Sequence, residues 1–162
     1  MNQVALIADR AMQKLAISFE VAGSPVCQGS KIAFVRGGRA VLVDVGNRKT
    51  KTMPANRLKD WRERIAAAAS QHITELWLGP IVLECEFVMP RSPSHFNKSG
   101  LKKGAPSIPV GDLDKLIRAV GDALSKVVYN DDVQIVGFGN STKRFARTRE
   151  AIGGVRVKVR QA

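Results

Sequence analysis

Residues 111–124 read Gly-Asp-Leu-Asp-Lys-Leu-Ile-Arg-Ala-Val-Gly-Asp-Ala-Leu, and this stretch decides the fold. Its apolar residues recur with the i, i+3, i+4, i+7 spacing of a helix that buries one face. We therefore expect a helix from Asp114 to about Lys126, with its apolar stripe in the core. Asp112 or Asp114 can cap the start of that helix, where exposed N–H groups and the helix dipole favour negative charge.

The same stretch begins an acidic cluster, because five of the 14 acidic residues fall between positions 112 and 132. Asp131 and Asp132 precede a predicted strand, 133–138, and a compact fold can return them to the start of the helix. Carboxylates that converge repel one another unless a cation lies between them. Mg²⁺ suits such a site because it takes oxygen ligands, keeps waters that a phosphate can displace, and activates a water nucleophile. The alternative interpretation is structural, with aspartates that only cap a helix and form a turn.

The length and charge of the chain limit the classes of protein to which it can belong. Its 162 residues favour one domain, with a core that needs no disulfides. Its 26 basic and 14 acidic residues give a net charge of +12, which indicates a polyanionic partner, nucleic acid above all. The alternative is a solvated basic surface that only keeps the protein in solution.

The two cysteines, Cys27 and Cys85, have neither a metal-binding spacing nor a disulfide pattern, so we expect a reduced cytoplasmic protein. No apolar run approaches the ~20 residues of a membrane helix, so we expect no membrane partner. A small-molecule cofactor is not expected either. Residues 1–15 are interpreted as an N-terminal extension, either a short helix or a frayed end, ahead of a domain that spans residues 16–162.

Hydrophobic patterning predicts an α+β fold, with one mixed β-sheet and two main helices packed on it. The first of these helices is expected over residues 54–75, with Trp61 as a core anchor rather than a platform for stacking bases. Period-two alternation or β-branched runs predict the strands. They are expected at 16–21, 32–35, 40–45, 81–89, 133–138 and 155–159.

The expected strand 81–89 has one apolar and one acidic face. Its pattern places Cys85 in the core as a small apolar residue. Glu84 and Glu86 fall on the other face, where they are either surface acids or neighbours of the acidic cluster. We favour surface acids.

Residues 91–109 are rich in proline, glycine and basic residues, so we expect no regular element there. A loop this long in a compact domain is usually functional or disordered. Because it leads into the acidic cluster, it is interpreted either as a mobile basic flap over the substrate or as a disordered insert. The residues expected to contact DNA lie in this loop and in the basic segment after the cluster: Arg91, Lys98, Lys102, Lys103, Lys143 and Arg144.

Three short motifs follow one another over residues 112–136. They read Asp112-Leu113-Asp114-x-Leu116-x-Arg118, then Asp122-Ala123-Leu124, then Asp131-Asp132-x-Gln134-Ile135-Val136. This series resembles the RusA family of Holliday junction resolvases, many of them carried by phages or prophages. The family pattern is Asp-x-Asp-Asn-Leu-x-Lys, then Asp-Ala-Leu, a short spacer and Asp-Asp-x-Gln.

The resemblance implies a RusA-like fold and a homodimer with two active sites that acts in the bacterial cytoplasm. Such an enzyme cuts four-way or other branched DNA during recombination and repair, and it leaves ligatable nicks. It depends on Mg²⁺, for which Mn²⁺ is expected to substitute. By position, the metal ligands would be Asp112, Asp114 and Asp132, with Asp131 as a further candidate.

Two residues depart from the family pattern beside those carboxylates. Lys115 stands where the family has Asn, and Arg118 stands where it has Lys. Arginine is a planar fork that stays charged, so Arg118 can hold a phosphate but cannot shuttle a proton. Arg118 and Lys115 are both candidates for the catalytic role of the family lysine, and the sequence leaves open whether one of them takes it or both share it.

Two other functions remain open on the sequence alone. One is a branched-DNA or flap nuclease with the same chemistry. The other is a non-catalytic basic DNA-binding dimer in which the aspartates are structural.

Overall fold

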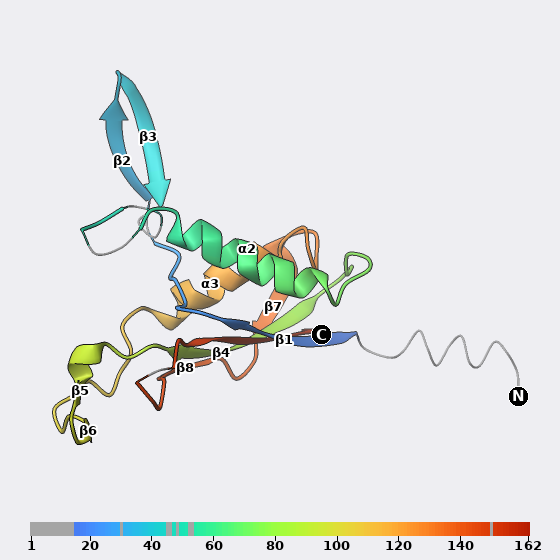
Figure 1. The fold of residues 1–162 in the computed structure, drawn as a ribbon. Coiled ribbons are helices and arrows are strands. Elements are labelled where there is room, and N and C mark those ends of the chain that lie inside the picture. The colour runs from blue at the N-terminus through green and yellow to red at the C-terminus, as the bar shows by residue number, and fades with distance from the viewer. Residues whose placement is uncertain (1–14, 30, 45–46, 48, 52–53, 150) are drawn as a thin grey trace, which may run out of the picture.

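A mixed five-stranded sheet lies against two helices in the computed structural model (Figure 1). The structure describes residues 15–29, 31–44, 47, 49–51, 54–149 and 151–162. The sheet has the order β1 (Ala16–Ala22), β9 (Gly154–Gln161), β4 (Ile81–Met89) and β7 (Ile135–Phe138), and β8 (Thr142–Phe145) also pairs with β4. The predicted α+β class is therefore confirmed.

Strand β4 is the centre of this sheet. One edge pairs antiparallel with β9 along its whole length, from Ile81 opposite Gln161 to Val88 opposite Gly154. The other edge is shared, because β7 pairs in parallel with its first part and β8 in parallel with its last part. The chain between β7 and β8 thus stays beside β4 and delivers β8 to the end of the sheet.

The core lies between one face of the sheet and the helices α2 (Arg57–Ser70) and α3 (Leu113–Leu124). Alternate residues of β4 and β9 point into it, as their strand patterns predict. Trp61 is 2% exposed and Cys85 fully buried, so both are core residues as predicted. Helix α2 ends at Ser70, five residues before the predicted end.

Within the described part of the chain, the opposite face of the sheet carries no helix, and it is lined by ion pairs between neighbouring strands. Lys158 Nζ lies 2.9 Å from Glu84 Oε1, and Arg156 Nη1 lies 3.5 Å from Glu86 Oε2. The prediction that Glu84 and Glu86 are surface acids is confirmed, because both are balanced by β9.

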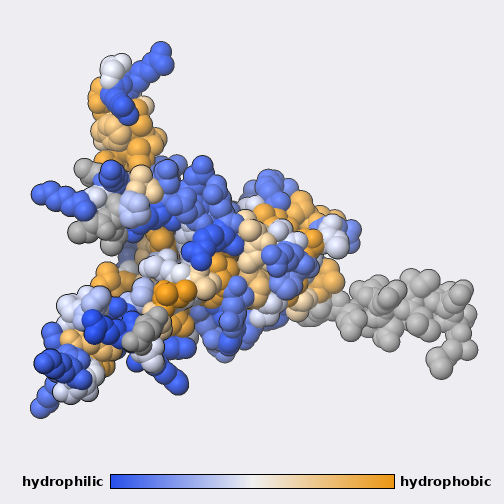
Figure 2. Space-filling view, viewed as in Figure 1, coloured by the Kyte–Doolittle hydropathy of each residue, from blue (hydrophilic) through white to orange (hydrophobic). Residues whose placement is uncertain are grey.

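Two segments project from this body (Figure 1). The first is the hairpin of β2 (Lys31–Arg36) and β3 (Arg39–Asp44), whose strands pair with each other and with no other strand among the described residues. Figure 2 shows it as an apolar strip with a hydrophilic tip. Phe34 and Val35 are 45% and 75% exposed, although they lie on opposite faces of the ribbon.

The second projection shows that one prediction is wrong, namely that residues 91–109 contain no regular element. Residues 91–109 do contain regular structure, namely the 3₁₀ turn η2 (Pro93–His95) and a small hairpin of β5 (Phe96–Asn97) and β6 (Gly100–Leu101). Local side-chain bonds make this possible, because Ser92 caps η2 and the Asn97 side chain accepts from Ser99 N. Such local bonds from Ser and Asn side chains to nearby backbone groups favour caps and turns.

A second correction concerns residues 133–138. The strand begins only at Ile135, because residues Asp132–Gln134 form the 3₁₀ turn η3. The predicted N-terminal extension lies outside the described residues except for Leu15, so the domain boundary stays a prediction. Within the described part of the chain, no helix is long and apolar enough to cross a membrane.

Candidate active site

Helix α3 begins with two exposed carboxylates. Asp112 occupies the N-cap position and Asp114 lies in the first turn. Asp112 makes no capping hydrogen bond through its side chain; its Oδ2 lies 2.6 Å from Lys115 Nζ instead. The hydrogen bond and charge of Lys115 hold the pKa of Asp112 below its usual value, so this carboxylate is ionised at neutral pH. The sequence did not reveal this pairing.

The chain immediately before α3 is fixed by contacts from distant segments. Lys143 Nζ of β8 donates to Pro109 O at 3.1 Å and to Gly111 O. Gly111 has a φ of +98°, and a Cβ there would lie 2.7 Å from Cys27 Sγ, so only glycine fits. Gln28 N donates to Lys115 O at 3.0 Å, which ties the loop after β1 to the first turn of α3.

Farther along α3, two polar side chains have different roles. Arg118 is exposed, and within the part of the chain that the structure describes it has no hydrogen-bond or ion-pair partner. Asp122 is half-buried and accepts from Arg62 of α2, which also donates to Gln28 Oε1. Asp122 therefore cross-links the two helices, whereas Arg118 remains available to a substrate.

Turn η3 carries the second acidic motif and is built as a capping box. The Asp131 side chain accepts from Val133 N at 3.0 Å, and the Gln134 side chain accepts from Asp131 N at 3.2 Å. Gln134 Nε2 donates to Trp77 O and Gly79 O at 3.0 and 2.9 Å. The glutamine of the Asp-Asp-x-Gln motif thus anchors η3 to the segment that precedes β4.

Asp132 projects from this turn and is exposed. Partial desolvation raises its pKa, and the adjacent Asp131 and then Asp122 raise it further. Its electrostatic neighbours are therefore these two acids. Among the described residues, no group of three or more His, Cys, Asp or Glu side chains is placed so that it could hold a metal ion. Among these residues, the structure thus does not bring Asp112, Asp114 and Asp132 together as one preformed ligand set, and their role as magnesium ligands stays a prediction.

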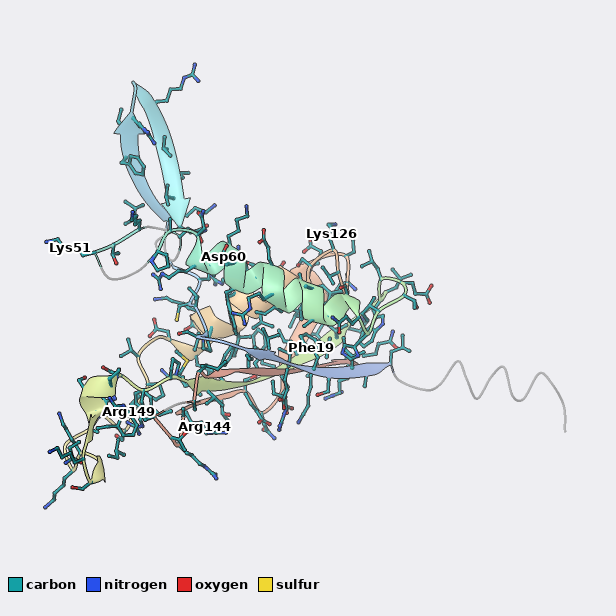
Figure 3. The ribbon with its side chains drawn as sticks, viewed as in Figure 1. Phe19, Lys51, Asp60, Lys126, Arg144 and Arg149 are labelled. Atoms are coloured by element: carbon teal, nitrogen blue, oxygen red, sulfur yellow. The ribbon has the colours of Figure 1, made fainter. Side chains whose placement is uncertain are left out.

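The predicted DNA-binding residues fall into two groups. Lys98, Lys102 and Lys103 are exposed on or beside the β5–β6 hairpin, whose end is hydrophilic in Figure 2. Arg144 is also exposed, and Figure 3 shows it directed away from the sheet on the side opposite the helices. These four side chains are available to a polyanion.

Arg91 and Lys143 are engaged within the protein instead. The guanidinium of Arg91 lies 4.1 Å from the centre of the Phe145 ring and donates to Pro106 O at 2.9 Å. Lys143 is partly buried on the carbonyls before α3. For both residues, direct contact with DNA stays a prediction.

Comparisons with known proteins place this arrangement in a family. A family model described as "Endodeoxyribonuclease RusA" matches residues 38–160, which include α2, α3, η3 and all of the sheet except β1 and the last residue of β9. The chain is also 30% identical over 126 residues to the "Uncharacterized protein YqaN" of Bacillus subtilis (strain 168), which covers 74% of this chain and 82% of that protein. The chain belongs to the RusA endodeoxyribonuclease family.

Proposed function

We propose that this chain is a Mg²⁺-dependent, structure-specific endodeoxyribonuclease that resolves Holliday junctions by paired symmetric nicks, as a homodimer. Membership of the RusA family supports a nuclease that acts on branched DNA junctions. The observation that carries the proposal is the exposed start of α3, where Asp112, Asp114 and Arg118 share two turns of one helix. Arg118 has no partner among the residues that the structure describes. A four-way junction has approximate two-fold symmetry, so a two-fold dimer would deliver two matched cuts.

The role of Mg²⁺ is supported by donor chemistry and by resemblance. Asp112 and Asp114 supply the oxygen ligands that this ion prefers, and Asp132 is the third family ligand by position. Among the described residues, these three side chains do not form one preformed ligand set, so binding of the ion would have to draw them together. We expect Mn²⁺ to replace Mg²⁺ in the same assay.

The two basic residues of α3, Lys115 and Arg118, have different roles in this proposal. Lys115 forms an ion pair with Asp112 and lowers the pKa of that carboxyl, so its positive charge is already engaged at the helix start. Arg118 is placed one helical turn after Asp114, where its fork can hold a phosphate oxygen pair. This division favours Arg118 over Lys115 as the phosphate-binding cation, because Lys115 is already paired.

The test is cleavage of a synthetic four-way junction by Asp114→Asn. We expect Mg²⁺-dependent cleavage to be lost while junction binding persists, because the substitution removes one charge and leaves the shape of the side chain. Asp60→Asn is the matched control, since Asp60 is an exposed acid in the first turn of α2. Full cleavage by Asp114→Asn would overturn the assignment of this residue.

Substrate preference requires a separate measurement. Junction, fork and plain duplex are compared with Mg²⁺, with Mn²⁺ and with neither, and both nick positions are mapped. Paired symmetric nicks in the junction alone support junction resolution. Preferred cleavage of the fork would indicate a flap nuclease, and no cleavage with either ion would indicate a DNA-binding protein without nuclease activity.

A further inference from the structure

We propose that Lys143 is a positioning residue that holds Asp112 in place by fixing the backbone immediately before α3. Its effect on catalysis rests on the proposed nuclease function, whereas its effect on the backbone does not. Lys143 Nζ donates to Pro109 O at 3.1 Å and also to Gly111 O, so it spans Val110 and ends next to Asp112.

The ammonium group of Lys143 is presented from a rigid base. Lys143 is paired with Phe87 of β4, and Ala146 N, just after β8, donates to Met89 O at 2.8 Å. Strand β4 is the centre of the sheet, and Phe87 is 1% exposed. The position of the lysine is therefore set by the core rather than by a loop.

The segment that receives these hydrogen bonds is anchored by burial only in part. Pro109 is buried, whereas Ile108 on one side of it is 74% exposed and Val110 on the other is 87% exposed. The segment is neither helix nor strand. Hydrogen bonds from a charged donor are about twice as strong as neutral ones, so Lys143 contributes much of the order here. Asp112 follows directly, and a displacement of about 1 Å can cost about 100-fold in rate.

This role differs from that of a lysine that binds DNA. An ammonium group has three N–H donors, and at least two of those of Lys143 are directed at backbone carbonyls. Its neighbour Arg144 is exposed and is the basic residue of β8 that faces solvent. Loss of Lys143 should therefore change the order of residues 109–112 more than it changes affinity for DNA.

The first experiment measures that order without any nuclease assay. A nitroxide spin label is attached to Val110→Cys in a Cys27→Ser background; Cys85 is fully buried and does not compete for the label. We expect Lys143→Met to make the label markedly more mobile, Lys143→Arg to restore part of the order, and Arg144→Met to leave the spectrum unchanged. An unchanged spectrum in Lys143→Met overturns the proposal.

The second experiment separates positioning from DNA contact in the unlabelled protein. For Lys143→Met we expect kcat on a four-way junction to fall by about 10- to 100-fold, with KM and the salt dependence of binding unchanged. A weaker affinity with a salt slope lower by about one would instead make Lys143 a phosphate contact and overturn the proposal. Unchanged kcat with a mobile label would overturn it as well.

The two experiments also keep this inference apart from the proposed function. If the parent protein cuts no branched DNA with Mg²⁺ or Mn²⁺, the proposed function fails. In that case the spin-label measurement still decides whether Lys143 fixes the backbone before α3.

Discussion

Two basic residues follow Asp112 and Asp114 in α3, and they differ in whether they already have an ion-pair partner. Lys115 is paired with Asp112 at 2.6 Å, whereas Arg118 has no partner among the described residues. We predict that Arg118→Ala lowers single-turnover cleavage by about 100-fold, as expected for a donor that stabilises charge in the transition state. Arg118→Lys should recover part of the rate, because the charge is kept and the fork is lost.

Lys115→Ala provides the comparison. It should reduce cleavage less than Arg118→Ala, because it acts on substrate through Asp112 rather than directly. Thermal unfolding of each variant shows whether the fold is retained. Equal rates for Arg118→Ala and the parent protein would mean that Lys115 or another residue binds the phosphate.

The adjacent residues Asp131 and Asp132 should respond to pH in opposite directions. Desolvation raises the pKa of Asp132 above the value that it has in the unfolded chain. At pH 7 the side chain is ionised in both states, so burying part of its charge lowers the stability of the fold. The Val133 backbone N–H lowers the pKa of Asp131, so its ionised form stabilises the fold. Asp132→Asn should therefore raise Tm at pH 7, and Asp131→Asn should lower it.

Both effects should be small, since the two side chains are exposed, and both should fade as pH falls. The gain from Asp132→Asn disappears below the ordinary aspartate pKa, where the parent residue is already protonated. The loss in Asp131→Asn disappears as Asp131 itself is protonated below its lowered pKa. Tm is measured from pH 3 to 7 without divalent cations, and shifts of the same sign would contradict the assignment.

At the scale of elements, η3 depends on one side chain that the family motif contains. The Gln134 side chain makes four hydrogen bonds to the backbone. It accepts from Asn130 N and Asp131 N, and it donates to Trp77 O and Gly79 O. At about 1 kcal/mol net per bond and with partial compensation by water, Gln134→Ala should lower the free energy of unfolding by about 2 kcal/mol. Cleavage should fall too, because η3 carries Asp132.

Gln71→Ala is the control for this substitution, because Gln71 is an exposed residue at the end of α2. Its effect should stay within about 0.5 kcal/mol. The measurement is urea unfolding of both variants, and the comparison of their free energies of unfolding requires that their m values are equal. Wild-type stability in Gln134→Ala would show that water replaces the tether without cost.

Elements with a strong hydrophobic period were predictable from sequence, and features made by distant contacts were not. The apolar stripe of α3 and the alternation of β4 placed both elements within two residues of their observed bounds. The pairing of Lys115 with Asp112 and the position of Asp132 depend on side-chain directions and on the path between α3 and β7. The turn η3 was missed because a capping box over three residues overrides the strand propensity of Val133.

At the scale of the whole molecule, the basic residues differ in how far they are available to bind DNA. The net charge is +12, yet Lys158 and Arg156 are balanced by acids on the helix-free face, and Lys143 is bound to carbonyls. The lysines of the β5–β6 projection have exposed ammonium groups on a segment that leads through residues 104–111 into α3. In Figure 1 the β5–β6 projection and the β2–β3 hairpin extend from the side of the molecule at which α3 begins.

This distribution predicts which lysines determine the salt dependence of DNA binding. Replacement of Lys98, Lys102 and Lys103 by Gln should lower the slope of log K against log salt by about two to three units, because each phosphate contact contributes about 0.9. The control replaces Lys59, Lys126 and Lys158 by Gln, which removes the same charge from residues that have partners elsewhere. Binding to a four-way junction is measured by titration between low and moderate salt. Equal slopes for the two triple variants would mean that the net charge as a whole, rather than the β5–β6 projection, attracts the DNA.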